Sequence, residues 1–213
     1  MRNNLAVPTF DEEQRLGAQG YTLVAGVDEV GRGALAGPVA AAAVILPAGL
    51  EQEWLGQVRD SKLLKPAVRR VLAGLIAKSA LAVGVGMVSH EEIDAIGIAP
   101  ASRLAMKIAV AQLSPVPQYL LVDYFRLPEI ALPQKGIVGG DGICFSIACA
   151  SIVAKVARDR LMKKLDRVYR GYGFARHKGY ATGAHLDCIS RLGPSPIHRR
   201  SFQPLREAGC PEA

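Results

Sequence analysis

Short apolar runs alternate along the chain with longer segments whose apolar residues recur at helical spacing. Four of the runs, at residues 21–28, 39–46, 81–88 and 119–122, have the length and composition of buried strands. Only a short glycine-containing turn separates the first two runs, whereas a parallel crossover needs about a dozen residues or more. The pattern therefore predicts that these two strands form an antiparallel hairpin.

Helices are predicted near residues 11–19, at 65–79, at about 99–113 and at about 145–169. Between the second and the third, Ser89 and Glu92 have the spacing of a capping box. This order of elements predicts an α/β fold in which helices flank a mixed central sheet, followed by a basic helical and loop-rich extension from about residue 170. We expect a single domain over residues 1–213, because the chain beyond the Gly-Pro-Ser-Pro sequence at 193–196 is too short for another.

Composition narrows the class of protein. Half of the 213 residues are hydrophobic, which is enough for a sizeable core. No apolar run reaches the length of about 18 residues that a membrane span needs, and the N-terminus lacks the pattern of a signal peptide. We therefore expect a soluble cytoplasmic protein that works as a monomer. Its four cysteines contain no C-x2-C pair, so we expect reduced thiols, with Cys144 and Cys149 as small core residues.

The charge is unevenly distributed. The whole chain carries +7, but residues 155–206 hold 13 of the 26 lysines and arginines and only three acidic residues. This segment alone therefore carries +10, and a polyanion such as nucleic acid is its natural partner. A solvated basic face is the equally weighted alternative on charge alone.

Carboxylates follow the predicted strands. Asp28 and Glu29 come at the end of the first apolar run, Asp123 ends the fourth, and Asp141 lies in a glycine-rich turn before the long helix. Such acids are costly to bury unless they are paired or bound to metal. Hard oxygen ligands without histidine or cysteine favour Mg²⁺ or Mn²⁺, and two such ions suit phosphodiester hydrolysis.

Each acid also has an ordinary structural interpretation. Asp28 would pair with Arg32, Asp123 would terminate its strand, and Asp141 would be a turn residue. Asp159, four residues after Lys155 on the long helix, is expected to form an exposed ion pair rather than to bind metal.

Other catalytic motifs fit poorly. Residues 31–36 match the dinucleotide-binding fingerprint, but a Gly-Pro pair and a strand follow where that fingerprint needs a helix. His90 lacks the second histidine of a zinc-protease motif, and no serine lies in a nucleophile elbow. Covalent catalysis and nucleotide cofactors are therefore disfavoured.

Taken together, the motifs resemble those of bacterial ribonuclease HII, a family in the RNase H-like group. The resemblance spans about residues 10–202. It rests on the runs VAGVDEVGRG at 24–33, DSK at 60–62, VD at 122–123, SIA through RD at 146–159, and HKGY at 177–180, with HR and SF near the end. The order and spacing of these motifs make chance agreement implausible.

The resemblance implies an RNase H-like fold and a catalytic, metal-binding set of Asp28, Glu29, Asp123 and Asp141. It implies that the turn Gly31, Arg32, Gly33 and the ring of Tyr180 recognise the ribonucleotide, since glycine permits close approach to a 2′-hydroxyl. Ser61 and Lys62 are implied phosphate contacts, with helix capping as the alternative for Ser61.

The implied reaction is hydrolysis of the RNA strand of RNA/DNA hybrids and nicking 5′ to a ribonucleotide embedded in duplex DNA. It would use Mn²⁺ or Mg²⁺, with two ions in catalysis, and leave a 3′-hydroxyl and a 5′-phosphate. The alternatives are a nucleic-acid-binding protein that has lost catalysis, and another RNase H-like nuclease such as a DNA nuclease or resolvase. Two positions beside the acids depart from the family pattern: Gly139 replaces a frequent lysine, and Tyr124 a common glycine.

Overall fold

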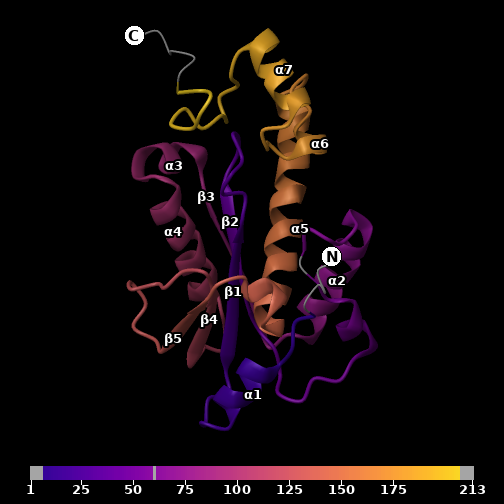
Figure 1. The fold of residues 1–213 in the computed structure, drawn as a ribbon, viewed down its shortest axis with the longest axis vertical. Coiled ribbons are helices and arrows are strands. Elements are labelled where there is room, and N and C mark those ends of the chain that lie inside the picture. The colour runs from indigo at the N-terminus through magenta and orange to yellow at the C-terminus, as the bar shows by residue number, and fades with distance from the viewer. Residues whose placement is uncertain (1–6, 60, 207–213) are drawn as a thin grey trace, which may run out of the picture.

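The structure is a computed structural model that describes residues 7–59 and 61–206. A five-stranded mixed sheet forms the centre, in the order β3-β2-β1-β4-β5 (Figure 1). β1 pairs with β2 and β2 with β3 in antiparallel fashion, whereas β1 and β4 and then β4 and β5 are parallel. The strands are β1 (Val24–Val30), β2 (Val39–Ile45), β3 (Ala82–Val88), β4 (Tyr119–Asp123) and β5 (Gln134–Ile137).

Helices cover both faces of the sheet (Figure 1). The helix α4 (Ile98–Ala111), preceded by α3 (His90–Ile96), packs on one face. The long helix α5 (Phe145–Val168) packs on the other, with α2 (Pro66–Ser79) outside it. Below the sheet lies α1 (Asp11–Gly17), and α6 (Phe174–His177) and α7 (Gly183–Leu192) extend beyond its upper end.

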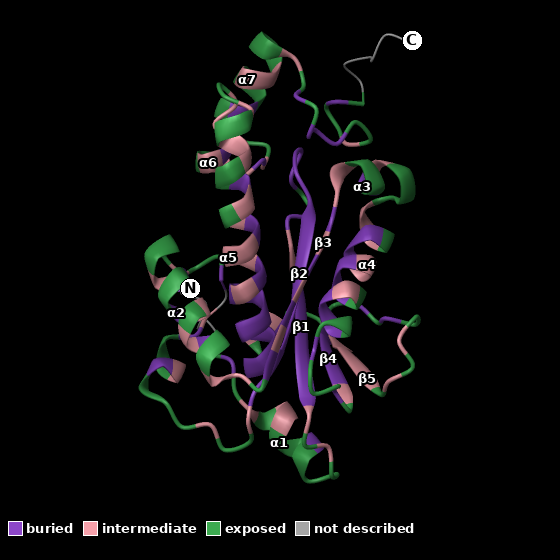
Figure 2. Cartoon of the chain, turned by 180° about the vertical axis from the view of Figure 1, so that it is seen from behind, coloured by how far each residue is buried: buried purple, intermediate pink, exposed green. Residues whose placement is uncertain are grey.

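β2 is buried along its whole length because it has a helix on each side (Figure 2). Successive residues of a strand point to opposite faces. Ala41 and Ala43 accordingly belong to the core under α4, while Ala42 and Val44 belong to the core under α5. The unbroken small apolar run at 39–45 thus suits a strand between two helical layers.

Glycines let the two helices come close to the sheet. A Cβ on Gly86 of β3 would lie 2.0 Å from the carbonyl oxygen of Ala105 in α4, and one on Gly26 of β1 would lie 2.2 Å from the backbone of Ser146 in α5. Backbone atoms cannot swing aside as side-chain ends can. These glycines therefore fix the distance between the layers.

We predict that Gly86→Ala lowers the free energy of unfolding by about 3 kcal/mol, because the added methyl forces α4 away from β3. Gly74→Ala is the matched control: Gly74 is an exposed residue inside α2 with nothing within 4 Å of the added Cβ. It should raise stability by about 0.5–1 kcal/mol through helix propensity. Urea denaturation followed by circular dichroism measures both, and a Gly86→Ala protein as stable as the parent would contradict the packing argument.

The capping box at Ser89 is confirmed. The Ser89 hydroxyl accepts a hydrogen bond from the backbone N–H of Glu92, whose carboxylate accepts one from the N–H of Ser89. The first residues of α5 are satisfied differently, because Cys144 provides no side-chain cap there. Instead, the Glu13 carboxylate of α1 accepts hydrogen bonds from the backbone N–H and the hydroxyl of Ser146 at 2.8 and 2.6 Å.

The predicted hairpin, strands and major helices are confirmed within a few residues, as are the α/β class and the mixed sheet. One expectation about the strands was wrong, and one strand was missed. The first strand continues to Val30, so Asp28 and Glu29 lie within it, opposite Ala42 and Ala41, rather than at its end. The strand β5 was missed because its sequence QKGI lacks an apolar pattern and it lies at the sheet edge.

Two of the cysteines behave as expected. Cys144 and Cys149 are buried, and burial raises the pKa of the Cys144 thiol to about 12 and that of Cys149 well above its usual value. Cys188 is a free thiol, and Cys210 lies outside the described residues. No helix in the described ranges has both the length and the apolar character that a bilayer crossing requires.

Candidate active site

Three carboxylates meet where two neighbouring strands run side by side. Val27 of β1 is in register with Val122 of β4, so the residues that follow them, Asp28 and Asp123, lie at the same level of the sheet. Asp28, Glu29 and Asp123 each offer a carboxylate oxygen, and these atoms all lie within 4.8 Å of one another. Parallel pairing of β1 and β4 thus assembles a cluster from residues far apart in sequence.

Burial makes this cluster electrostatically unfavourable by itself. The Asp28 side chain is buried, and burial, followed by the charges of Glu29 and Asp123, raises its pKa well above the usual value. Burial also raises the pKa of Glu29 to about 7, although Arg32 opposes the shift. The pKa of Asp123 is raised by burial as well, against a 2.7 Å hydrogen bond from the backbone N–H of Gly140.

The cluster fits a divalent cation. The Oε2 atom of Glu29 is buried and has no hydrogen-bond partner among the described residues. The arginine that the sequence suggested for Asp28 pairs with Glu29 instead, since the Arg32 Nη1 atom lies 3.3 Å from Glu29 Oε1. Arg32 and the charge of Lys62 do not offset the burial of the three close carboxylates, whose pKa values are all raised, and a hard cation bound by oxygen ligands would stabilise their ionised forms.

Asp141 lies beside this cluster, in the 3-10 turn η2 (Gly140–Gly142). After burial and nearer contacts, its charge also contributes to the raised pKa of Asp28 and of Asp123. Its Oδ2 atom is 3.8 Å from the Nζ atom of Lys62. The four predicted acids are therefore gathered in one region, three of them in the tight group and Asp141 at its side.

A cleft of about 460 Å³ opens over the carboxylates. Its lining consists of the three clustered acids together with Val30, Ser61, Lys62, Arg69, Ser151, Lys155 and Tyr180. Ser61, Lys62 and Tyr180, three residues that the sequence suggested for substrate contact, thus face the same space as the acids. The turn at 31–33 lies outside this lining, although Glu29 and Val30 lead directly into it.

Ser61 is held from two sides. Its hydroxyl accepts a 3.0 Å hydrogen bond from the hydroxyl of Ser151, and its carbonyl accepts one from the Arg69 guanidinium at 2.6 Å. The alternative that Ser61 caps the next helix was wrong, because the N-cap of α2 is Lys65. Asp60 of the same motif lies outside the described residues.

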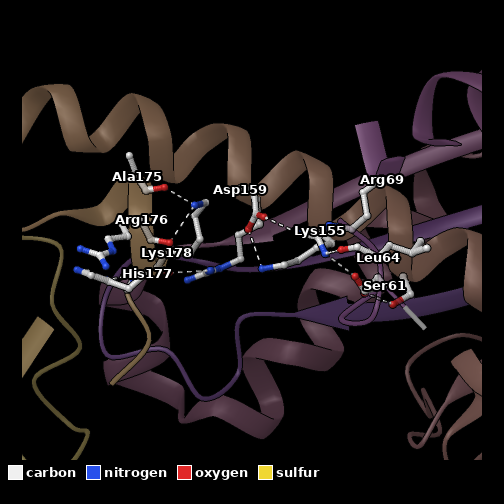
Figure 3. A network of polar contacts seen from close by, with 12 residues as sticks. Ser61, Leu64, Arg69, Lys155, Asp159, Ala175, Arg176, His177 and Lys178 are labelled. Atoms are coloured by element: carbon white, nitrogen blue, oxygen red, sulfur yellow. Dashed lines mark hydrogen bonds and ion pairs between the residues drawn. The ribbon is translucent and has the colours of Figure 1, made fainter. Parts of the chain in front are cut away.

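The sequence did not single out the polar face of α5 that lines the cleft. Ser151 acts to lower the pKa of Asp28, against the effect of burial. Lys155 lies one turn further along α5, and Asp159 lies one turn beyond that. Asp159 pairs with Lys155 at 2.8 Å, as predicted, and also with Arg69 at 3.7 Å (Figure 3). With only 16% of its side chain exposed, it is not the exposed ion pair that was expected. The four-residue spacing of these polar residues was the available signal.

Two buried arginines bind the backbone of the glycine turn and of the residues that follow it. Arg158 donates hydrogen bonds to the carbonyl oxygens of Pro38, Lys178 and Ala36, and Arg199 donates to those of Gly37 and Arg32. Both side chains are fully buried, and burial lowers the pKa of Arg199 to about 9. The turn leads into β2 and not into a helix, so rejection of the dinucleotide fingerprint is confirmed.

Tyr180 belongs to a segment that lies along the same turn. Tyr180 forms an isolated antiparallel bridge with Ala34, and the N–H of Leu35 donates to the carbonyl of Gly179 at 2.7 Å. Its ring lies near the cations of Lys155 and Arg158, 5.4 and 5.5 Å from the ring centroid. The structure therefore brings Tyr180, the glycine turn and the acids together.

Comparison with known proteins identifies the family to which this chain belongs. The sequence profile described as Ribonuclease HII matches residues 25–205, which is most of the chain. The chain belongs to the ribonuclease HII family. A curated ribonuclease HII from Dehalococcoides mccartyi is 60% identical to this chain, and the match covers 93% of this chain and 94% of that protein. A curated ribonuclease HII from Moorella thermoacetica is 52% identical, and the match covers 90% of this chain and 91% of that protein. The resemblance seen in the motifs is confirmed, and the protein is a ribonuclease H, an endonuclease.

Solved structures agree. The ribonuclease HII of Archaeoglobus fulgidus, in a structure described as its complex with PCNA, is similar with a TM-score of 0.70 and 26% identity, over 85% of this chain and 95% of that one. The ribonuclease H2 of Pyrococcus horikoshii gives a TM-score of 0.66 at 25% identity, over 86% and 95% of the two chains. The predicted RNase H-like fold is thereby confirmed.

The two departures from the ribonuclease HII pattern have visible consequences. Tyr124 directly follows Asp123 with φ of +58°, a left-handed conformation that glycine adopts without strain and tyrosine does not. Its exposed ring lies 5.9 Å from the Arg32 guanidinium, which also lies 4.8 Å from the ring of Phe125. Gly139 is left-handed as well, with φ of +66°, and leads the chain back so that Gly140 reaches Asp123.

Proposed function

We propose that this ribonuclease HII hydrolyses the RNA strand of RNA/DNA hybrids and also nicks duplex DNA on the 5′ side of an embedded ribonucleotide, leaving a 3′-hydroxyl and a 5′-phosphate. The observation that carries the proposal is the cluster of three carboxylates within 4.8 Å in a cleft that also contains Tyr180. Duplex DNA that contains ribonucleotides is thus a proposed substrate. Removal of these ribonucleotides from DNA is a proposed role in replication and repair.

We propose Asp28, Glu29, Asp123 and Asp141 as the ligands of two divalent ions, Mg²⁺ or Mn²⁺. The all-oxygen donor set and the buried, unpartnered Glu29 oxygen support this choice. When bound, such ions activate water for attack on the phosphodiester and stabilise negative charge on the departing oxygen.

Side chains of α2 and α5 orient the residues that would bind the substrate. Ser151 of α5 donates a hydrogen bond to the Ser61 hydroxyl, and Arg69 of α2 donates one to the backbone carbonyl of Ser61. Through these contacts Ser61 and the highly exposed Lys62 are positioned beside the acids, where they would bind a substrate phosphate.

A second cleft of about 720 Å³ continues from the first and shares Arg69, Lys155 and Tyr180 with it. Its lining holds seven basic residues and a single acid, Asp159: Arg69, Arg70, Lys155, Arg160, Lys163, Arg176 and Lys178. A groove of this charge suits the phosphate backbone of a duplex and provides a grip that is independent of sequence and sensitive to salt.

Selectivity for ribose is proposed to come from Gly31, Arg32, Gly33 and Tyr180. Arg199 donates a hydrogen bond to the carbonyl of Arg32 in the turn, and Arg158 lies against Gly31 while it donates to Ala36 just after the turn. Only RNA carries a 2′-hydroxyl, and a glycine turn allows a backbone group to approach it closely. The ring of Tyr180 would pack on the sugar of the following nucleotide.

Replacing Tyr180 tests this assignment. We expect Tyr180→Ala to lower kcat/KM at a single embedded ribonucleotide by about tenfold or more, and to lower it less on a long hybrid, where other riboses provide contacts. Tyr180→Phe keeps the ring and should stay near the parent on both substrates. Steady-state cleavage of the two labelled substrates measures the ratio, and equal losses on both would contradict the recognition role.

We further propose that the enzyme works as a monomer in the cytoplasm and that residues 1–213 form one domain. The free thiols of Cys144, Cys149 and Cys188 support a reducing compartment. The exposed large apolar residues belong to many different elements, as scattered apolar residues on a monomer do.

A further inference from the structure

Three histidine rings gather around Phe174 in the C-terminal extension. The ring centroids of His177 and His185 are 4.2 Å apart, and those of His185 and His198 are 5.2 Å apart. His185 and His198 are fully buried, so their ring nitrogens must find partners inside the protein. None of the three lines the cleft over the acids.

The contacts of His185 and His198 indicate which ring nitrogen carries the proton. The backbone N–H of Ser195 donates to His198 Nδ1 at 2.8 Å, and the hydroxyl and carbonyl oxygens of Ser195 lie 2.8 and 3.2 Å from the same nitrogen. A hydrogen on Nδ1 would lie against the Ser195 N–H, so we assign the proton of His198 to Nε2. A carbonyl oxygen can only accept, so His185 Nδ1, 2.9 Å from the carbonyl of Tyr180, must carry the proton of His185. The two Nε2 atoms are 3.1 Å apart, with a donor on His198 and an acceptor on His185.

The result is a directed chain of hydrogen bonds from Ser195 through His198 and His185 to the backbone of Tyr180. The chain requires both rings to be neutral, because a second proton would place two N–H groups against each other. Burial lowers the pKa of each histidine to about 4, so both are neutral at physiological pH.

Both ends of this chain are tied to the segment that follows the glycine turn. Tyr180 forms a bridge with Ala34 at one end, and His198 forms one with Ala36 at the other. The backbone N–H of Arg199 also donates to the carbonyl of Leu35 at 2.8 Å. The histidines therefore close a loop of contacts that joins Tyr180, residues 34–36 and residues 195–199.

We propose that His185 and His198 are positioning residues, which set the backbone of Tyr180, and so its ring, for contact with the ribonucleotide. The inference rests on the proposed role of Tyr180 in ribose recognition. It adds two residues that do not touch the substrate, and it assigns each of them one tautomer.

Two amide substitutions at one position separate positioning from folding. In His185→Asn the amide nitrogen stands where Nδ1 stood, so the bond to the Tyr180 carbonyl is kept and the bond to His198 is lost. In His185→Gln the amide stands where Nε2 stood, so the bond to His198 is kept and the bond to Tyr180 is lost. Each variant loses one hydrogen bond from the same buried place, which makes them matched controls for stability.

The measured quantity is the ratio of kcat/KM on a duplex with one ribonucleotide to that on a long hybrid, taken well below each variant's melting temperature. We expect His185→Gln to lower this ratio by about five- to tenfold, and His185→Asn to leave it near the parent value. The same ratio in both variants would overturn the positioning role and leave only a structural one. If Tyr180→Ala itself left the ratio unchanged, the proposed recognition by Tyr180 would fail, and the positioning role with it.

Nitrogen NMR of the histidine rings tests the chain without any activity. At neutral pH we expect the Nδ1–H tautomer for His185 and the Nε2–H tautomer for His198, assigned by comparison with the two variants. The reverse tautomers, or a charged ring at either position, would overturn the chain even where the enzyme is active.

Discussion

Asp28→Asn is expected to slow cleavage by about 1,000-fold or more while binding of an RNA/DNA hybrid stays within a few fold of the parent. Asp28 is the most deeply buried of the clustered acids. Loss of its charge removes a ligand from the proposed ion site, and a bound ion stabilises transition-state charge by several kcal/mol. Cleavage is measured on a labelled hybrid, and binding by fluorescence anisotropy with EDTA present.

The same substitution should not unfold the protein. Burial and the charges of Glu29 and Asp123 disfavour an ionised Asp28 in the absence of metal, so a neutral amide relieves repulsion. We expect the melting temperature of Asp28→Asn in EDTA to equal or exceed that of the parent. Asp187→Asn, at an exposed position on α7, is the control for loss of one carboxylate. Full activity in Asp28→Asn would contradict the assignment of this acid.

Gly31→Ala is expected to lower the free energy of unfolding by about 2–4 kcal/mol. Gly31 has φ of +93°, and an added Cβ would lie 2.2 Å from the Nε atom of Arg158. That side chain cannot move aside, because its guanidinium is bonded to three backbone carbonyls. The variant should therefore lose its fixed turn together with part of its stability.

Gly33→Ala is the matched control two residues away. Its added Cβ meets nothing within 4 Å and its backbone is not left-handed, so stability should change by less than about 1 kcal/mol. Urea denaturation of the two variants measures the difference. Equal stability of Gly31→Ala and Gly33→Ala would show that Arg158 does not hold the turn.

The proximity of the acids could be predicted because the strands that precede them are recognisable from their apolar sequence. The apolar runs before Asp28 and Asp123 marked two strands, and pairing of adjacent strands then brought the acids together. The error in the end of β1 arose because two polar residues were taken to terminate a strand. Pairing with Ala41 and Ala42 of β2 carries the strand through them to Val30.

The supporting residues were harder to find because their partners are distant backbone atoms. Arg158 and Arg199 counted toward the basic charge of the C-terminal segment, yet both are buried and bind carbonyl groups of residues 32–38. Net charge in a sequence does not distinguish such internal cations from those that face a substrate. The basic cleft is therefore formed by fewer cations than the segment contains.

The hydrogen bonds between the histidines could not be predicted from sequence for the same reason. His185 and His198 are separated by 13 residues without a motif spacing, and their hydrogen bonds depend on how α7 and the following loop return to residues 34–36. Their proton positions follow only from which neighbours donate and which accept. Tyr180 was predicted from the family motif, but what holds it was visible only in three dimensions.

The most direct test of the proposed function is cleavage of a labelled DNA duplex that carries one ribonucleotide, with Mg²⁺, with Mn²⁺ and with EDTA, beside all-DNA and all-RNA duplexes. We expect metal-dependent nicking on the 5′ side of the ribose, with a 3′-hydroxyl product and no cleavage of all-DNA. Cleavage of all-DNA, or tight binding without cleavage in either metal, would contradict it.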